Sequence, residues 1–242
     1  MSELRALLSD TTEKVLANLP ADEKTAWKQV NDSGLPNVMA SESDGGFGGG
    51  WEDAFIVLRA SGYHATPIAL AEAVAEIKLK TANAETKFRT IALVRSCQMA
   101  GAMQAALDLS VQYVRERQQF GKPLASFQAI QQQLAVFAEE AAATNMAAAA
   151  ACRAADRSEA IFEIACAKLR ANMAVGTATS VAHQVHGAMG FTAEYKLQRL
   201  TKLLWQWRSE FGNDRYWADK LGSLVAGKGP DGFWPLLCDS AA

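Results

Sequence analysis

One guanidinium and two amide side chains have the chemistry needed to hold a dinucleotide. Arg117 stands just before a turn that contains Gly121, and its rigid fork of donors matches diphosphate oxygens in a way that a lysine cannot reproduce. Gln128 and Gln184 each carry a planar amide that donates and accepts, which suits the edges of ribose or adenine. Each residue alone also has a plainer interpretation: Arg117 as a solvated charge at a helix end, and the glutamines as surface residues.

The same residues belong to two motifs whose order and spacing favour the binding interpretation. The first motif, RERQQFGKPL, covers residues 115–124 and is followed by SFQ at 126–128, and the second, HQVHGAMGF, covers residues 183–191. Together they resemble the flavin-binding signature of acyl-CoA dehydrogenases. In that family an Arg-x-x-Phe-Gly turn joins two long helices, and its arginine reaches the diphosphate of an FAD held mainly by the neighbouring subunit. The resemblance implies FAD contacts by Arg117, Phe127, Gln128, Gln184, Gly187 and Ala188.

The resemblance also implies a glutamate base, and here the sequence departs from the family's pattern. Removing a proton beside a thioester carbonyl needs a carboxylate that is close to the carbon and partly desolvated. Family members carry it in the loop after the fourth bundle helix or, in a subset, on the first helix. Counted without gaps from the two motifs, these positions fall on Phe211 and Ile91, which accept no proton. Glu210 is the weak remaining candidate, but Phe211 continues an apolar stripe, so we expect Glu210 to point elsewhere.

Other groups that could form sites are less convincing. His183 and His186 lie three residues apart, but no third ligand at helical spacing accompanies them, so we expect no metal site. The glycine-rich segment 43–50 lacks the Gly-Lys-Ser/Thr of a P-loop and the preceding strand of a Rossmann turn. It resembles instead the glycine-rich turn in the N-terminal helical domain of acyl-CoA dehydrogenases, as does the stretch ATPIALAE at 65–72.

The elements that must position these residues are predicted to be helices. One helix is expected from Ser2 to about Asn18, and a second is expected to begin after a cap at Asp22 and to end near Gly34. Four later segments carry apolar residues at intervals of three and four, which predicts a four-helix bundle. Their stripes are Met103, Leu107, Val111 and Val114; Phe127, Ile130, Leu134, Phe137 and Ala141; Phe162, Ala165, Leu169, Met173 and Gly176; and Leu197, Leu200, Leu204, Trp207 and Phe211.

A β-domain is missing from the predicted order of elements. Acyl-CoA dehydrogenases usually place a β-barrel domain between the N-terminal helices and the bundle. Here the polar stretch 80–87 leads straight into the first bundle helix, without the alternating pattern of a strand. We therefore predict an all-α chain with an N-terminal helical domain at residues 1–80 and an FAD-contacting four-helix bundle at 81–242.

Composition excludes several classes of partner. Half of the residues are apolar, yet no unbroken apolar run approaches the ~20 residues that span a bilayer. The net charge is −2, without a basic block large enough for a nucleic-acid footprint. The first residues lack the layout of a secretory signal, so we expect a cytoplasmic protein. Widely scattered cysteines, predicted to be reduced thiols, stand at Cys97, Cys152, Cys166 and Cys238.

The function expected from the resemblance is that of one subunit in a heteromeric, FAD-dependent acyl-CoA dehydrogenase. A full-length partner would supply the flavin-ring pocket, the base and most of the acyl-CoA tunnel, and an electron-transfer flavoprotein would reoxidise the cofactor. Two alternatives stay open: a self-sufficient homodimeric dehydrogenase with Glu210 as base, and a non-catalytic structural or regulatory helical subunit. Steroid side chains, branched acids and ordinary fatty acids all remain possible acyl groups.

Overall fold

The N-terminal part of the chain folds into four α-helices and two short 3₁₀ helices (η1 and η2). The computed structural model describes residues 3–241, so the predicted helix start at Ser2 lies outside it. The predicted cap at Asp22 is confirmed, because its carboxylate accepts a hydrogen bond of 2.8 Å from the Thr25 amide. In chain order the elements are α1 (Glu3–Leu16), α2 (Glu23–Asp32), η1 (Leu35–Asn37), η2 (Glu42–Asp44), α3 (Trp51–Tyr63) and α4 (Leu70–Leu79).

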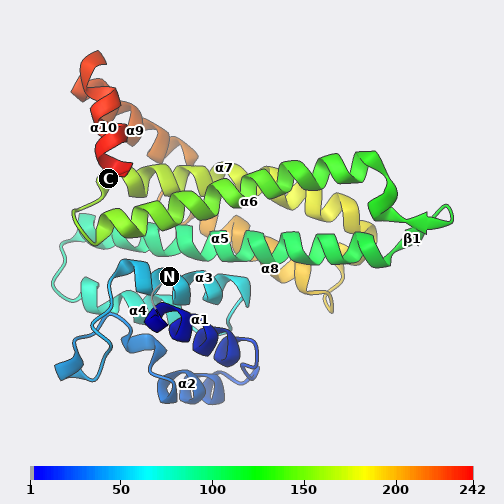
Figure 1. Ribbon diagram of the computed structural model, residues 1–242, viewed down its shortest axis with the longest axis horizontal. Helices are drawn as coiled ribbons and strands as arrows, with labels where there is room; N and C mark the ends of the chain where they lie inside the picture. Colours follow the sequence, from blue (N-terminus) through cyan, green and yellow to red (C-terminus); the bar gives the residue numbers. More distant parts are fainter. Residues whose placement is uncertain (1–2, 242) are drawn as a thin grey trace.

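The rest of the chain forms the predicted bundle, with two further helices after it. Helix α5 has 33 residues and so runs about 50 Å, and α6 and α7 lie along it (Figure 1). The only strands among residues 3–241 have two residues each, so the all-α prediction is confirmed. The elements are α5 (Ala84–Glu116), β1 (Gln118–Gln119), β2 (Lys122–Pro123), η3 (Leu124–Ser126), α6 (Gln128–Ala155), α7 (Ile161–His186), η4 (Gly187–Phe191), α8 (Lys196–Ser209), α9 (Asp214–Lys228), η5 (Pro230–Gly232) and α10 (Phe233–Ala241).

The glycine-rich segment forms a folded turn before α3. The amide of Gly49 donates to the carbonyl of Val38 at 2.9 Å. The first two main-chain amides of α3 donate hydrogen bonds to a distant side chain. The Asp156 carboxylate at the end of α6 accepts them from Trp51 and Glu52, at 2.5 and 3.0 Å. This helix start is therefore anchored to the bundle by a side chain.

Two hydrophobic clusters hold the molecule together. One joins the N-terminal helices to the bundle and includes Val57, Leu93, Ala148 and Ile164 from four different helices. The other fills the bundle itself and includes Phe137. The predicted division at residue 80 falls in the connection between α4 and α5, and it stays a prediction, since the first cluster spans both sides of it.

A pair of glycines lets α3 approach α5 at backbone distance. A Cβ added at Gly62 would lie 2.0 Å from the carbonyl oxygen of Gln98, and one added at Gly101 would lie 1.8 Å from that of Arg59. Neither gap admits a methyl group, so only glycine fits at this crossing. The N-terminal helices are thereby packed directly on the backbone of the central helix.

Most members of the predicted apolar stripes are buried or half-buried, and two of them, Val111 and Met173, are exposed. The fourth stripe is buried from Leu197 to Trp207. On α7, Met173 is 56% exposed and Gly176 faces open space, because the buried face of this helix is made of alanines, among them Ala171 and Ala174. On α5, Val111 lies in a shallow surface groove where no other helix covers it, so its predicted burial is wrong.

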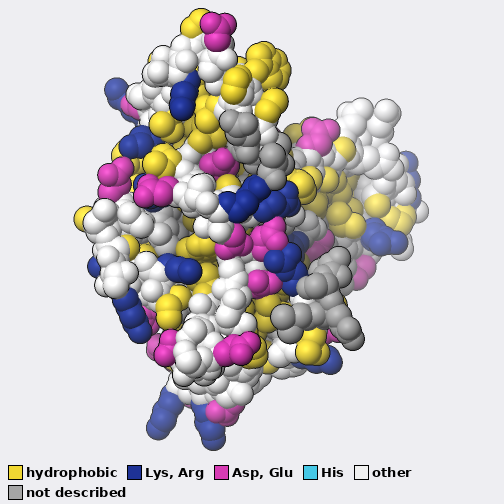
Figure 2. All heavy atoms as spheres, turned by 60° about the vertical axis from the view of Figure 1, so that its left-hand side comes forward, with side chains coloured by type: hydrophobic (Ala, Val, Ile, Leu, Met, Phe, Trp, Pro, Cys, Tyr) yellow, Lys and Arg dark blue, Asp and Glu magenta, His cyan; other side chains and the backbone are white. Residues whose placement is uncertain are grey.

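Apolar side chains also gather on the surface around the last helix. Figure 2 shows them at the upper end of the molecule, where α10 lies. Tyr216 is 44% exposed and Trp234 is 70% exposed. Within residues 3–241, no helix combines the length and the apolar character needed to cross a membrane.

Candidate cofactor-binding end and acid loop

A short hairpin presents Arg117 at one end of the bundle (Figure 1). Arg117 closes α5, and its main chain is fixed on both sides: its amide donates to Tyr113 and its carbonyl accepts from Leu124, each at 2.8 Å. Phe120 and Gly121 form the tip with φ of 53° and 77°, the left-handed pair that a two-residue hairpin turn requires. The Arg117 side chain is exposed and has no ion pair or hydrogen bond within the described part of the chain.

Helix α6 begins directly after this hairpin. Phe127 is its cap residue and is half-buried, with the Phe120 ring 6.2 Å away, edge to face. The Lys122 ammonium lies 4.4 Å from the centre of the Phe127 ring, within the range of a cation–π contact. Gln128 is the first helical residue and is exposed. No side chain caps the start of α6, and uncapped amides at a helix start favour a negatively charged ligand.

The second motif lies at the end of α7, beside the end of α5. The two ends touch through Tyr113 and His186, whose ring centres are 4.5 Å apart. Gln184 and Gly187 are exposed and line a shallow groove of about 510 Å³ together with His183. Gly187 has a φ of 57°, and Ala188 follows it in the exposed turn η4. The structure therefore brings both motifs to the same end of the bundle.

The two histidines of the second motif are held by packing and hydrogen bonds. His186 is buried, and its ring nitrogens bond to the Ala182 carbonyl at 2.7 Å and to the Tyr195 hydroxyl at 3.1 Å. His183 stacks on Phe191 at 4.3 Å, and burial lowers the pKa of both imidazoles. The Nδ1 atom of His183 is buried without a hydrogen-bond partner. A Cβ added at the buried Gly190 would lie 3.1 Å from this atom, so Nδ1 faces the packed turn and not the open groove.

Residues 210–213 connect α8 to α9 and are called the acid loop here, because they include Glu210, the candidate base. Glu210 follows α8, and both of its carboxylate oxygens have partners: Oε2 accepts from Arg95 Nε at 2.7 Å and Oε1 accepts from Gln206 Nε2 at 2.7 Å. Phe211 adopts a left-handed φ of 52° and packs edge to face on Phe88 at 5.7 Å. The last residue of the predicted fourth stripe, Phe211, therefore lies in the turn after α8 and not in the helix itself. Both oxygens of Glu210 are committed to partners inside this chain.

Arg95 is the centre of a charged cluster that sequence reasoning did not identify. Its guanidinium also binds Glu72 at 2.6 Å and lies 5.9 Å from the centre of the Trp207 ring. It lines a polar cavity of about 200 Å³ between α4, α5 and α8. Because Ile91, the other position for a base, is an apolar residue one turn before Arg95, this region offers an ion-paired guanidinium in place of a free carboxylate.

A buried lysine fixes the acid loop from behind. Lys168 of α7 has no exposed surface. Its ammonium donates to Asn172 Oδ1 at 2.6 Å and to the main-chain carbonyls of Trp207, Arg208 and Gly212 at 2.9, 3.2 and 3.3 Å. Burial lowers the pKa of Lys168 to about 7. The sequence gives no signal for this residue: all four acceptors are neutral carbonyl oxygens, so no acidic partner residue points to it.

Comparison with known proteins decides the family. The model of the acyl-CoA dehydrogenase C-terminal domain matches residues 81–204. This chain belongs to the acyl-CoA dehydrogenase family. A probable acyl-CoA dehydrogenase of Bacillus subtilis, YngJ, is 40% identical over 103 residues, which cover 42% of this chain and 27% of that protein. The chain thus matches about a quarter of that relative's length.

Two solved structures share the fold over most of this chain. The ChsE4–ChsE5 complex from Mycobacterium tuberculosis matches with a TM-score of 0.82 and 15% identity, covering 93% of this chain and 98% of the other. The steroid acyl-CoA dehydrogenase Tcur3481–Tcur3483 matches with a TM-score of 0.81 and 16% identity, over the same shares. At these identities the likeness concerns the fold alone.

Within this acyl-CoA dehydrogenase chain, the predicted site residues fit an adenosine diphosphate group. Arg117 offers a free guanidinium, and Gln128 and Gln184 are exposed amides, of which Gln184 lines the groove at the end of α7. These groups supply the donors that a diphosphate and an adenosine need. The FAD contacts themselves remain a prediction.

Proposed function

We propose that this chain is the non-catalytic subunit of a heteromeric, FAD-dependent acyl-CoA dehydrogenase. The observation that carries the proposal is the contrast between the two ends of the bundle. At the hairpin end, Arg117 keeps its guanidinium free. At the acid loop, Glu210 has both oxygens bound by Arg95 and Gln206. Groups that would hold a cofactor are available, whereas the group that would remove a proton is not.

In the proposed complex this chain holds the nucleotide half of FAD. Arg117 would pair with the diphosphate, and Phe127, Gln128, Gln184 and the backbone at Gly187 and Ala188 would contact the diphosphate–adenosine end. A full-length acyl-CoA dehydrogenase subunit supplies the flavin-ring pocket and the base. FAD, when bound, accepts the hydride in α,β-dehydrogenation of an acyl-CoA thioester, and an electron-transfer flavoprotein reoxidises it.

Two fold matches support the heteromeric assembly. The ChsE4–ChsE5 structure is a complex of two proteins, and the Tcur3481–Tcur3483 structure is likewise named after two proteins. The second is called a steroid acyl-CoA dehydrogenase, which makes a steroid side chain one candidate substrate beside branched and straight acyl chains. The apolar side chains left exposed on α9 and α10 also suit a chain that is covered by a partner.

Co-expression with a full-length acyl-CoA dehydrogenase encoded beside this chain tests the proposal. We expect the chain alone to self-associate or to bind little FAD, and the pair to purify as a yellow complex with a fixed subunit ratio and acyl-CoA dehydrogenase activity. A monodisperse, yellow and active species from this chain alone would favour the homodimeric alternative. A stable complex that lacks flavin would favour a purely structural subunit.

A further inference from the structure

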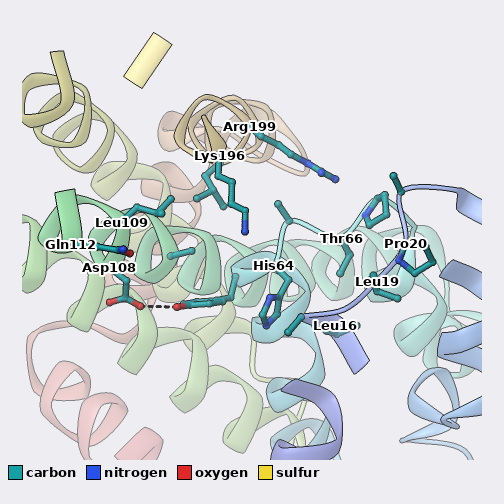
Figure 3. A pocket seen from close by; sticks show the side chains of 17 residues that line it. Leu16, Leu19, Pro20, His64, Thr66, Asp108, Leu109, Gln112, Lys196 and Arg199 are labelled. Carbon is teal, nitrogen blue, oxygen red and sulfur yellow. Dashed lines mark hydrogen bonds between the residues drawn. The ribbon is translucent and has the colours of Figure 1, made fainter. Parts of the chain in front are cut away.

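A pocket of about 540 Å³ lies between the N-terminal helices and the bundle (Figure 3). Four segments meet around it: the α1–α2 connection, the turn after α3, the last third of α5 and the first turn of α8. Its volume is within the ~300–1,000 Å³ of pockets that bury a small molecule. None of the residues assigned above to FAD or to the acid loop lines it.

Apolar side chains line this pocket on two sides. Leu16, Leu19 and Pro20 come from the N-terminal side, and Leu109 and Leu200 come from the bundle. Figure 3 shows the N-terminal and bundle residues facing each other across the opening. An apolar body placed between them would be removed from water on two sides, which favours binding.

The rim carries two positive charges that nothing in the described chain neutralises. Lys196 and Arg199, both in the first turn of α8, line the pocket and form no ion pair within residues 3–241. In Figure 3 both side chains extend from α8 on the same side of the opening. Two unpaired cations beside the apolar side chains of this pocket favour a ligand with an anionic head.

The acidic groups near the pocket are already engaged. Asp108 accepts from the Tyr63 hydroxyl at 2.9 Å and from Gln104 at 2.8 Å, and His64 pairs with Glu13 at 2.8 Å. Burial, and then the hydrogen bond to Asp108, raise the pKa of the Tyr63 phenol to about 12, so Tyr63 remains a neutral donor. The lining keeps two cations against one carboxylate.

We propose that this pocket binds an amphiphilic anion, with its carboxylate or phosphate head at Lys196 and Arg199 and its apolar body between Leu16 and Leu109. The site is separate from the proposed FAD contacts and needs no flavin to form. It would give the subunit a ligand of its own, held where the N-terminal helices meet the bundle.

Calorimetric titration with dodecanoate, below its micelle concentration, tests the site in the complex with the partner subunit. The double substitution Lys196→Gln with Arg199→Gln should weaken one saturable binding event about tenfold or more, since two charge-assisted contacts are lost. Lys202→Gln is the matched control, because Lys202 lies exposed on the same helix without lining the pocket, and it should change nothing. Gln112→Trp, at an exposed lining position, should weaken binding by filling the space.

Three further ligands separate the contributions of head and body. Dodecyl phosphate should bind and be sensitive to the same double substitution, whereas dodecanol and inorganic phosphate should each bind at least tenfold more weakly than dodecanoate. Equal binding of dodecanol, equal binding of phosphate alone, or an unchanged dodecanoate affinity in the double variant would each overturn the proposal. If the chain proves monodisperse alone, the same titrations apply to it, so this test stands apart from the assembly test.

Discussion

Arg117 combines a fixed main chain with a side chain that has no partner within residues 3–241. At the scale of single residues, this is what a cofactor held across an interface requires: the backbone is placed in advance, and the donors remain available. The neighbouring Lys122 is already occupied by the Phe127 ring. Loss of the Arg117 side chain should therefore weaken cofactor binding without destabilising the fold.

We expect Arg117→Ala to weaken FAD retention in the complex, and Arg117→Lys to weaken it less. Lysine keeps the charge but cannot form the bidentate pair, while alanine leaves a phosphate charge unpaired, at a cost of about 2–5 kcal/mol if the site is closed by the partner. The measurement is flavin occupancy after extensive dialysis, and excess FAD should restore activity. Full occupancy in both variants would show that Arg117 is only a surface charge.

Glu210→Gln tests the acid loop at the same scale. Loss of a true general base should lower turnover by at least ~10²-fold. Because Glu210 is bound by Arg95 and Gln206, we expect the assembled complex to keep nearly all of its activity with FAD still bound. A hundredfold loss in steady-state turnover would instead identify Glu210 as the base and favour the self-sufficient enzyme.

At the scale of elements, Lys168 ties the end of α8 to α7 through main-chain carbonyls. Its pKa is lowered from 10.5 to about 7 by burial, so between pH 7 and 10.5 the unfolded chain holds a proton that the folded chain has released. The free energy of unfolding must therefore rise with pH through this window, relative to a variant without the amine.

We expect Lys168→Met to lower stability by about 1–3 kcal/mol near pH 8, since the buried carbonyls lose their donor. The difference in unfolding free energy between the wild type and Lys168→Met should widen as pH rises from 7 to 10. Urea unfolding of both proteins at several pH values measures it. A difference that stays constant or narrows over this range would contradict the pKa of Lys168.

The helices that the sequence predicted best are those whose buried face is made of large apolar residues. Helix α8 is such a case, with Leu197, Leu200 and Leu204 all buried. The stripe on α7 was placed partly wrong because alanine, and not methionine, faces the neighbouring helices there: Met173 is exposed and Ala174 is buried. Small side chains allow helices to approach closely. Hydrophobicity alone does not reveal that the alanine face of a helix, and not its methionine, is the buried one.

The candidate site could be predicted only where a local motif marks it. The motif around Arg117 and that around Gln184 were found because their spacing is fixed within one turn or helix end. Lys168 could not be found in this way, since its carbonyl partners follow 39 to 44 residues later. Arg95 was missed for the same reason, because Glu210 lies 115 residues away.

At the scale of the whole molecule, the N-terminal helices and the bundle are joined where Gly62 and Gly101 let α3 cross α5. We expect Gly101→Ala to lower the free energy of unfolding by about 1–3 kcal/mol, because the added methyl group must push the backbone of α3 away. Gly176→Ala is the control: it faces open space on a helix, so it should be neutral or stabilising by about 0.5–1 kcal/mol. Thermal or urea unfolding compares the two, and equal effects would show that the crossing tolerates a side chain.

The exposed hairpin between α5 and α6 also has a consequence for proteases. Its tip residue Phe120 is 91% exposed, and exposed loop tips are the preferred places for chain cleavage. Trypsin can cut after Arg117 but not after Lys122, because Pro123 follows it. Limited digestion should therefore split the free chain near residue 117 and leave it whole once a partner and FAD cover the hairpin, which makes the hairpin a direct indicator of assembly that requires no flavin spectrum.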